Sequence, residues 1–208
     1  ARQAFENGIS AAQSGKYETA LVDFRKSLAF SRNEDAGNDF LARVHFNIGV
    51  SLYRLQRNEE AVAEYELAIK LSEKSYEKAF YALGMAQSEL ENWQAAEHAF
   101  LEAIRLNRRN GEAWFDLAFV YLARKNFDAA KQAFQKSIEY KSVDASIGHN
   151  NLGVIFALNG DLPSAVKEFE TALKKSGGKL VEAERNLQLC KTVGQDLPVK
   201  LEFTKFEE

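Results

Sequence analysis

The chain has 208 residues, of which 46% are hydrophobic and 27% are charged, the composition of an ordinary folded protein. Its 27 Lys and Arg against 30 Asp and Glu give a formal net charge of −3, too balanced to favour a nucleic-acid or anionic-membrane partner. No apolar run approaches the roughly 18–20 residues of a membrane span, so membrane insertion is not expected.

The single cysteine, Cys190, excludes an intrachain disulfide and any two-cysteine redox motif. One free thiol suits a reducing compartment such as the cytoplasm. A targeting segment that had been removed would leave the same chain, so the compartment stays open.

A trio of small, small and aromatic residues recurs five times along the chain. In the stretch Glu77 to Asn110 it is Gly84, Ala96 and Phe100. The other copies are Gly8/Ala20/Phe24, Gly49/Ala61/Tyr65, Ala118/Ala130/Phe134 and Gly153/Ala165/Phe169. Successive copies are separated by 41, 35, 34 and 35 residues. Five copies at a nearly fixed period predict one continuous solenoid of helix pairs rather than a single globular core.

The first repeat is predicted to form two helices around the turn Ser14-Gly15-Lys16, because Gly15 suits the left-handed conformation that ends many helices. Seven extra residues separate this repeat from the second, nearly two helical turns. The third helix is therefore predicted to begin early, around Gly37–Asp39, with Asp35 or Asp39 as its N-cap. A plain surface loop is the alternative.

The whole repeat domain is predicted over residues 1–193. Its repeats are expected at 1–34, 42–75, 77–110, 111–144 and 146–179, followed by a capping helix at about 179–193. The capping helix carries Leu180, Ala183, Leu187 and Cys190 on one face, which would cover the apolar side of repeat five. Cys190 is then a buried small hydrophobe and not a nucleophile.

The C-terminal tail, 194–208, has a different pattern. Leu197, Val199, Leu201 and Phe203 alternate with mostly polar neighbours, as they would in a strand. A lone strand is not stable by itself. The tail is therefore expected to be disordered, or extended against the chain's own groove or a partner's surface.

The repeat pattern resembles the tetratricopeptide repeat family over nearly the whole chain. Repeat four supplies the family's consensus positions as Trp114, Leu117, Ala118, Tyr121, Ala130, Phe134 and Ser137. Repeat five supplies them as His149, Leu152, Gly153, Phe156, Ala165, Phe169 and Ala172. The resemblance implies an all-α, right-handed solenoid superhelix. It also implies that the first helices of the pairs line a concave groove, which binds an extended or helical segment of another protein.

On each first helix, repeat positions 2, 5, 9 and 12 lie on a stripe roughly 150° from the packing face, and positions 6 and 13 neighbour it. The candidate partner-binding residues chosen from these stripes are Phe5, Arg43, Phe46, Asn47, Tyr53, Lys78, Tyr81, Met85, Phe115, Asp116, Phe119, Leu122, Asn150 and Asn151. Rings and a methionine on an open face are typical of protein-binding surfaces. The alternative is that several, especially Val50, Met85, Phe119 and Val154, pack against the adjacent repeat.

Two candidates, Asn47 and Asn151, share repeat position 6. An amide side chain donates and accepts together, so it can pair with the backbone of an extended peptide without reading its sequence. The other repeats carry Glu6, Ala82 and Asp116 there, which would interrupt a ladder of such pairs.

No arrangement of residues predicts catalysis, a cofactor or a metal site. Of the three histidines, His45 and His149 occupy a packing position, and His98 stands apart from any ligand motif. The chain has no HExxH motif and no glycine-rich phosphate loop. The sequence thus predicts a non-catalytic adaptor or scaffold that binds a protein or peptide. The alternative is a self-assembly module that forms homo-oligomers through the apolar groove or the tail.

Overall fold

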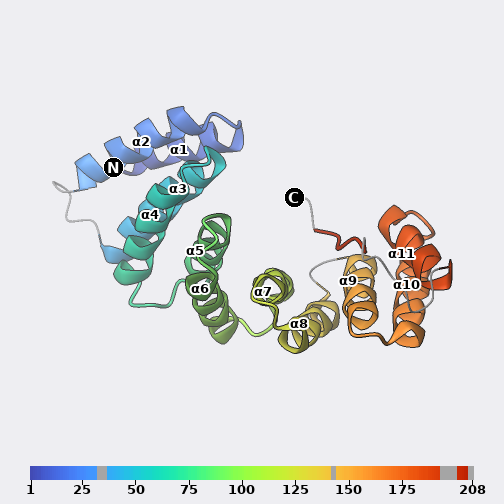
Figure 1. Cartoon of the computed structure of the whole chain (residues 1–208). Coiled ribbons are helices and arrows are strands. Elements are labelled where there is room, and N and C mark those ends of the chain that lie inside the picture. The colour runs from blue at the N-terminus through green and yellow to red at the C-terminus, as the bar shows by residue number, and fades with distance from the viewer. Residues whose placement is uncertain (32–36, 142–143, 193–200, 206–208) are drawn as a thin grey trace. The chain divides into compact units, whose positions relative to one another are not determined.

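The computed structural model describes residues 1–31, 37–141, 144–192 and 201–205, and the regular structure in these ranges is entirely α-helical (Figure 1). The chain divides into two compact units, Ala1–Arg108 and Arg109–Glu208. Within the described ranges, no helix is both long and apolar enough to cross a membrane.

The first unit consists of three pairs of consecutive helices, and Figure 1 shows the two helices of a pair side by side. Its helices are α1 (Arg2–Gln13), α2 (Tyr17–Ser31), α3 (Asn38–Arg54), α4 (Asn58–Leu71), α5 (Glu77–Glu89) and α6 (Trp93–Leu106). Each helix packs against its partner in the pair, and α2 and α4 also pack against the first helix of the next pair. This is the stacking that the repeat period predicts.

The second unit continues the pattern with two pairs and a single helix. Its helices are α7 (Gly111–Ala123), α8 (Phe127–Tyr140), α9 (Ala145–Leu158), α10 (Leu162–Ser176) and α11 (Val181–Thr192). The last helix, α11, packs against α10 and α9. Cys190 on α11 is buried, and burial raises the pKa of its thiol, so its interpretation as a core residue is confirmed.

Helix boundaries agree with the sequence prediction at one turn and one helix start, and they differ at one cap. Gly15 has φ +72°, the left-handed conformation expected after α1. Helix α3 begins at Asn38, within the early start predicted. Its N-cap is Gly37, with no side-chain hydrogen bond, so the prediction of Asp39 as the cap is wrong. Asp39 lies in the first turn, where its charge favours the helix dipole, and Asp35 lies outside the described residues.

In the helix pairs, a small residue on the first helix faces an aromatic ring on the second. A methyl group added at Gly84 would lie 2.7 Å from ring atoms of Phe100, whose side chain is completely buried. The same contact would be 2.5 Å between Gly8 and Phe24. The glycine therefore lets the two backbones approach closely enough for the ring to fill the space between them.

In repeats two and five, a polar contact also joins the two helices of the pair. His45 Nδ1 lies 2.6 Å from Glu64 Oε2 in repeat two, and His149 Nδ1 lies 2.7 Å from Glu168 Oε2 in repeat five. Repeats three and four carry apolar pairs at the same positions, namely Phe80 with Ala99 and Trp114 with Ala133. These histidines join the two helices of a pair, and the described residues contain no cluster of three potential metal ligands.

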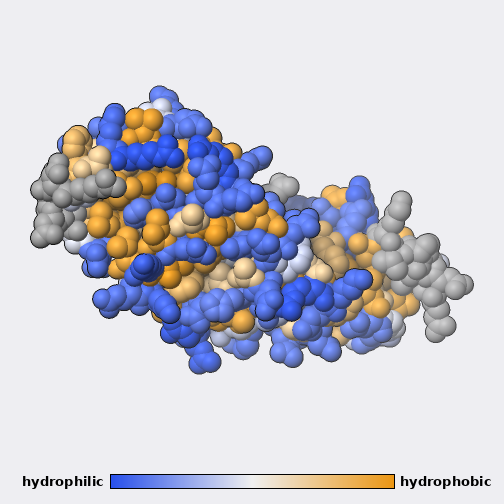
Figure 2. Space-filling model, turned by 60° about the vertical axis from the view of Figure 1, so that its left-hand side comes forward, coloured by the Kyte–Doolittle hydropathy of each residue, from blue (hydrophilic) through white to orange (hydrophobic). Residues whose placement is uncertain are grey.

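Apolar side chains are also scattered over the outside of the first unit. Val22, Phe30, Leu67 and Leu101 are exposed, and Figure 2 shows apolar surface interleaved with hydrophilic surface. Scattered exposed apolar residues are common on protein surfaces and do not mark a binding site by themselves.

The contact between glycine and ring can be tested by overpacking it. We expect Gly84→Val to lower the free energy of unfolding by about 2 kcal/mol, because the added branches meet a buried ring that cannot move aside. In a Phe100→Leu background, the same change should cost at least about 1 kcal/mol less. Urea denaturation followed by circular dichroism measures both values, and an equal cost in the two backgrounds would refute this role of the contact.

Candidate peptide-binding site

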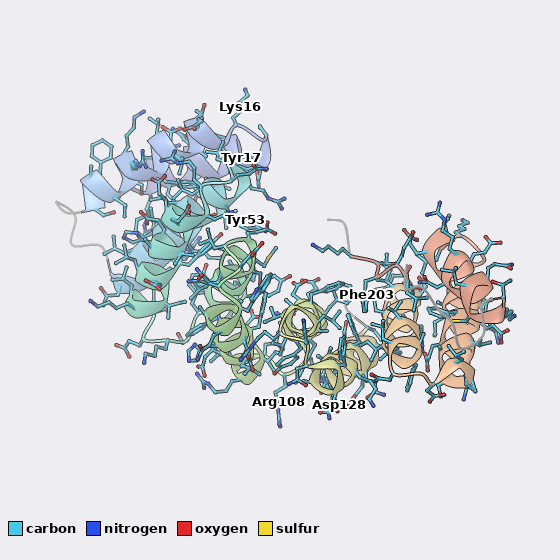
Figure 3. The ribbon with its side chains drawn as sticks, in the orientation of Figure 1. Lys16, Tyr17, Tyr53, Arg108, Asp128 and Phe203 are labelled. Atoms are coloured by element: carbon cyan, nitrogen blue, oxygen red, sulfur yellow. The ribbon has the colours of Figure 1, made fainter. Side chains whose placement is uncertain are left out.

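In the second unit, residues Leu201–Lys205 run in extended form beside α9, where Figure 3 labels Phe203. Asn151 on α9 forms two hydrogen bonds with one residue of this segment. The Thr204 backbone N–H donates to Asn151 Oδ1 at 2.8 Å, and Asn151 Nδ2 donates to the Thr204 carbonyl at 2.9 Å. The amide thus pairs with both backbone groups of Thr204.

Asn186 on α11 pairs with Glu202 in the same way. The Glu202 backbone N–H donates to Asn186 Oδ1 at 2.9 Å, and Asn186 Nδ2 donates to the Glu202 carbonyl, also at 2.9 Å. Alternate residues of an extended chain direct their backbone groups to the same side. The two asparagines therefore pair with the backbone of the segment as the edge of a neighbouring β-strand would.

Asn150 connects the two pairs. Its Nδ2 donates to the Glu202 carbonyl and to Thr204 Oγ1, both at 3.0 Å, and its Oδ1 accepts from Asn186 Nδ2 at 2.9 Å. All three asparagine side chains are 0% exposed. Buried amides need partners for their donors and acceptors. Here the backbone and one hydroxyl of the extended segment pair with each of the three side chains, whereas Asn150 Oδ1 is paired with Asn186.

Apolar contacts hold the other side of the segment. The Phe203 and Phe119 ring centroids lie 6.4 Å apart at an interplanar angle of 70°, an edge-to-face arrangement. Phe203 also packs against the core clusters around Phe134 and Phe169, and Leu201 packs against the latter. The segment thus combines paired backbone groups with two apolar side chains that are partly buried.

A charged contact lies at the edge of the site. Arg185 Nη1 on α11 is 3.3 Å from Glu202 Oε2, and both side chains are largely exposed. Exposed ion pairs typically contribute about 0–1 kcal/mol. The affinity of the groove for this segment therefore depends on the asparagines and the apolar contacts.

The predicted site residues of the second unit fall into three groups. Asn150, Asn151 and Phe119 contact the extended segment. Phe115 is 2% exposed and packs its ring against Phe134 and Phe119, so its prediction as an open contact residue needs correction. Two further candidates, Asp116 and Leu122, are half-buried.

In the first unit, Phe5 needs the same correction. It is 3% exposed, because its ring packs against Phe24 of the same pair and Phe40 of α3. Asn47 shares the repeat position of Asn151, but its Nδ2 donates to the Arg43 carbonyl of its own helix at 2.7 Å. The other candidates are half-buried or exposed, namely Phe46, Tyr53, Tyr81 and Met85 in the first class and Arg43 and Lys78 in the second.

Sequence reasoning missed Asn186 and treated α11 only as a cap. The repeat period contained the signal, because Asn186 follows Asn151 by 35 residues (186 minus 151), the step between neighbouring repeats. By this spacing, Asn186 on α11 corresponds to position 6 of a first helix, although α11 has no partner helix among the described residues. The contacts of Glu202 and Thr204 could not be found this way, since the tail lies outside the repeat pattern.

Comparison with known sequences identifies the family of these repeats. The chain matches the tetratricopeptide repeat family over residues 42–75, 81–142 and 120–179. The chain belongs to the tetratricopeptide repeat family. The all-α solenoid class predicted from the sequence is thereby confirmed, together with the helix pairs described above.

Individual relatives are distant. Anaphase-promoting complex subunit 3 of Schizosaccharomyces pombe is 27% identical over 161 residues, which cover 76% of this chain but only 24% of that protein. A crystal structure of MamA superposes with TM-score 0.74 at 24% identity, covering 83% of this chain and 95% of that one. The structure of YrrB, described as a tetratricopeptide repeat protein with an unusual peptide-binding site, superposes with TM-score 0.73 at 19% identity, covering 89% and 91%.

The pairing of asparagine with backbone predicts how the tail behaves in solution. We expect the amide hydrogen of Thr204 to exchange at least about tenfold faster in Asn151→Ala, because its hydrogen-bond acceptor is lost. Asn47→Ala is the matched control, since it removes the same residue type at the same repeat position. Hydrogen exchange measured by NMR tests this, and equal exchange rates in the wild type and Asn151→Ala would contradict the docked geometry.

Proposed function

We propose that this chain is a protein-interaction module whose second unit holds an extended segment of a partner protein along α9 and α11. Proteins of the tetratricopeptide repeat family are generally interaction modules and are generally non-catalytic. The observation that carries the proposal is the pairing of Asn151 and Asn186 with the backbone groups of Thr204 and Glu202.

This geometry favours an extended ligand over a helical one. A helix satisfies its own backbone N–H and C=O groups internally, so it offers none of them to side chains along its length. An extended segment leaves both groups of every second residue available on one side. The side chains of Asn151 and Asn186 match that arrangement.

The expected affinity is moderate. A net hydrogen bond contributes about 0.5–1.5 kcal/mol, and a fully buried phenylalanine contributes about 1.5–3 kcal/mol, of which the partly buried Phe203 gains a part. Association and the ordering of a flexible peptide oppose these gains. A short segment should therefore bind reversibly, as suits an adaptor or scaffold. The description of YrrB as a protein with a peptide-binding site is consistent with such a role for this fold.

The same docked segment favours one other function. Residues 201–205 could occupy the groove of a second copy, which would join chains by exchange of their tails. Self-assembly is thus the second candidate, and it would use the same three asparagines. Light scattering distinguishes the two candidates. A chain that stays monomeric at tens of micromolar excludes assembly at those concentrations.

Selection from a random peptide library tests the proposal. The library is displayed on phage and selected on the intact chain carrying Thr204→Pro, which removes the backbone N–H that binds Asn151 and so releases the tail. We expect a set of peptides to be enriched on this chain and lost when Asn151→Leu is added.

The matched control adds Asn47→Leu instead of Asn151→Leu, and it should leave the selected peptides unchanged. Circular dichroism confirms that each variant keeps its helices. Enrichment that is equally strong with Asn151→Leu, or no enrichment on any chain, would contradict a peptide-binding groove at α9 and α11.

A further inference from the structure

We infer that the groove selects extended segments with the pattern apolar–any–Phe–Thr/Ser, and that Leu201–Thr204 is the chain's own copy of this pattern, which a partner must displace. This inference rests on the proposed function and adds the class of partner and its regulation. It follows from the side-chain contacts that each position of the docked segment makes.

Asn150 recognises the hydroxyl at the fourth position of the pattern, which Thr204 occupies in the docked segment. Its Nδ2 has two hydrogens, and its two close acceptors are the Glu202 carbonyl and Thr204 Oγ1, both at 3.0 Å. The next acceptor, Asn151 Oδ1, is 3.5 Å away. Because Asn150 is 0% exposed, a ligand without a hydroxyl would leave one donor poorly paired. Threonine and serine both supply the oxygen.

Asn150 is unusual for its place in the repeat. Position 5 carries a ring in all four other repeats, as Phe5, Phe46, Tyr81 and Phe115. Those rings pack, whereas the amide of Asn150 turns this position in repeat five into a polar contact beside the apolar one made by Phe119. In the ligand, a hydroxyl residue directly after an aromatic residue can contact Asn150 and Phe119 at the same time.

The apolar positions are the first and third. Leu201 and Phe203 lie on the same face of the extended segment, since successive side chains alternate. Both pack against the cluster that contains Val154 and Phe169. The ring of Phe203 additionally meets Phe119 edge to face. Loss of the ring would remove contacts from two core clusters at once.

The second position is open to any residue. The Glu202 side chain is exposed, and its partner Arg185 is more exposed still. Such pairs contribute little, because water screens them. Asn186 therefore binds the backbone at the second position, and the groove does not recognise the side chain there.

The tail must compete with any partner that carries this pattern. Only eight residues of sequence, 193–200, separate α11 from Leu201, so the tail is present at a high effective concentration. Short tethers between a ligand and its site generally give a concentration on the order of millimolar. The intact chain should therefore bind a free segment weakly until the tail is released.

The test uses a fluorescent peptide with the sequence of residues 198–206, PVKLEFTKF, and fluorescence polarisation. On the full chain carrying Thr204→Pro, we expect Phe203→Ala or Thr204→Val in the peptide to weaken binding about tenfold or more. Thr204→Ser and Glu202→Gln in the peptide should change the Kd by less than about threefold. Phe203→Glu is a second chain variant that releases the tail.

Two comparisons assign the contacts to their residues. On a chain that also carries Asn150→Ala, the unmodified peptide and its Thr204→Val variant should bind equally, whereas Asn47→Ala should preserve their difference. The wild-type chain should bind the unmodified peptide at least about tenfold more weakly than the chain with Thr204→Pro, because its own tail competes.

Each alternative outcome overturns a stated part. Equal binding of all peptide variants refutes the sequence pattern but leaves a groove that reads only backbone. Equal affinity of the wild type and Thr204→Pro refutes competition by the tail, and a dimer that Thr204→Pro dissolves assigns the tail to a second copy. Peptides of unrelated sequence enriched by the phage selection would keep the proposed function and refute the pattern. If neither the peptide nor any library member binds, the proposed function and the sequence pattern are both refuted.

Discussion

The close contact between a small residue and a ring determines the geometry of every helix pair in this chain. Glycine at positions such as Gly84 lets a ring such as Phe100 lie directly against the backbone of the facing helix. The packing face of each first helix is then occupied by its own partner helix. On α9, a side chain roughly half a turn away, that of Asn151, is left to contact the extended segment. The binding stripe is thus a consequence of where the core contact lies.

The proposed binding function depends on buried amides more than on exposed rings. Asn150, Asn151 and Asn186 are completely buried, and a buried amide is costly unless its donor and acceptor are both paired. The extended segment provides the partners for all three side chains. When that segment leaves, water or another extended chain has to replace it. Replacement by a chain with the same hydrogen-bonding groups is what makes the site a candidate for exchange between the tail and a partner.

Much of this could be predicted from the sequence, and the exceptions have physical reasons. The period of the small–small–aromatic trio predicted the helix pairs, and an amide at position 6 indicated pairing with backbone. Phe5 and Phe115 were misplaced because position 5 lies at the border of the packing face, where a large ring can turn into the core. The docking of Leu201–Lys205 depends on contacts between residues about 50 positions apart, such as Asn151 with Thr204, and periodicity within a repeat carries no information about them.

In the proposed function, the length of the asparagine ladder explains why side chains must supply the specificity of the groove. Successive first helices carry position 6 at Asp116, Asn151 and Asn186. Only the last two are amides, and an ionised aspartate can accept a hydrogen bond but cannot donate one to a carbonyl. The asparagine ladder therefore pairs with the backbone of only two alternate residues of the bound segment. Backbone pairing at two residues holds any extended chain about equally well, so discrimination between partners falls to Phe119, which meets the ring, and Asn150, which meets the hydroxyl.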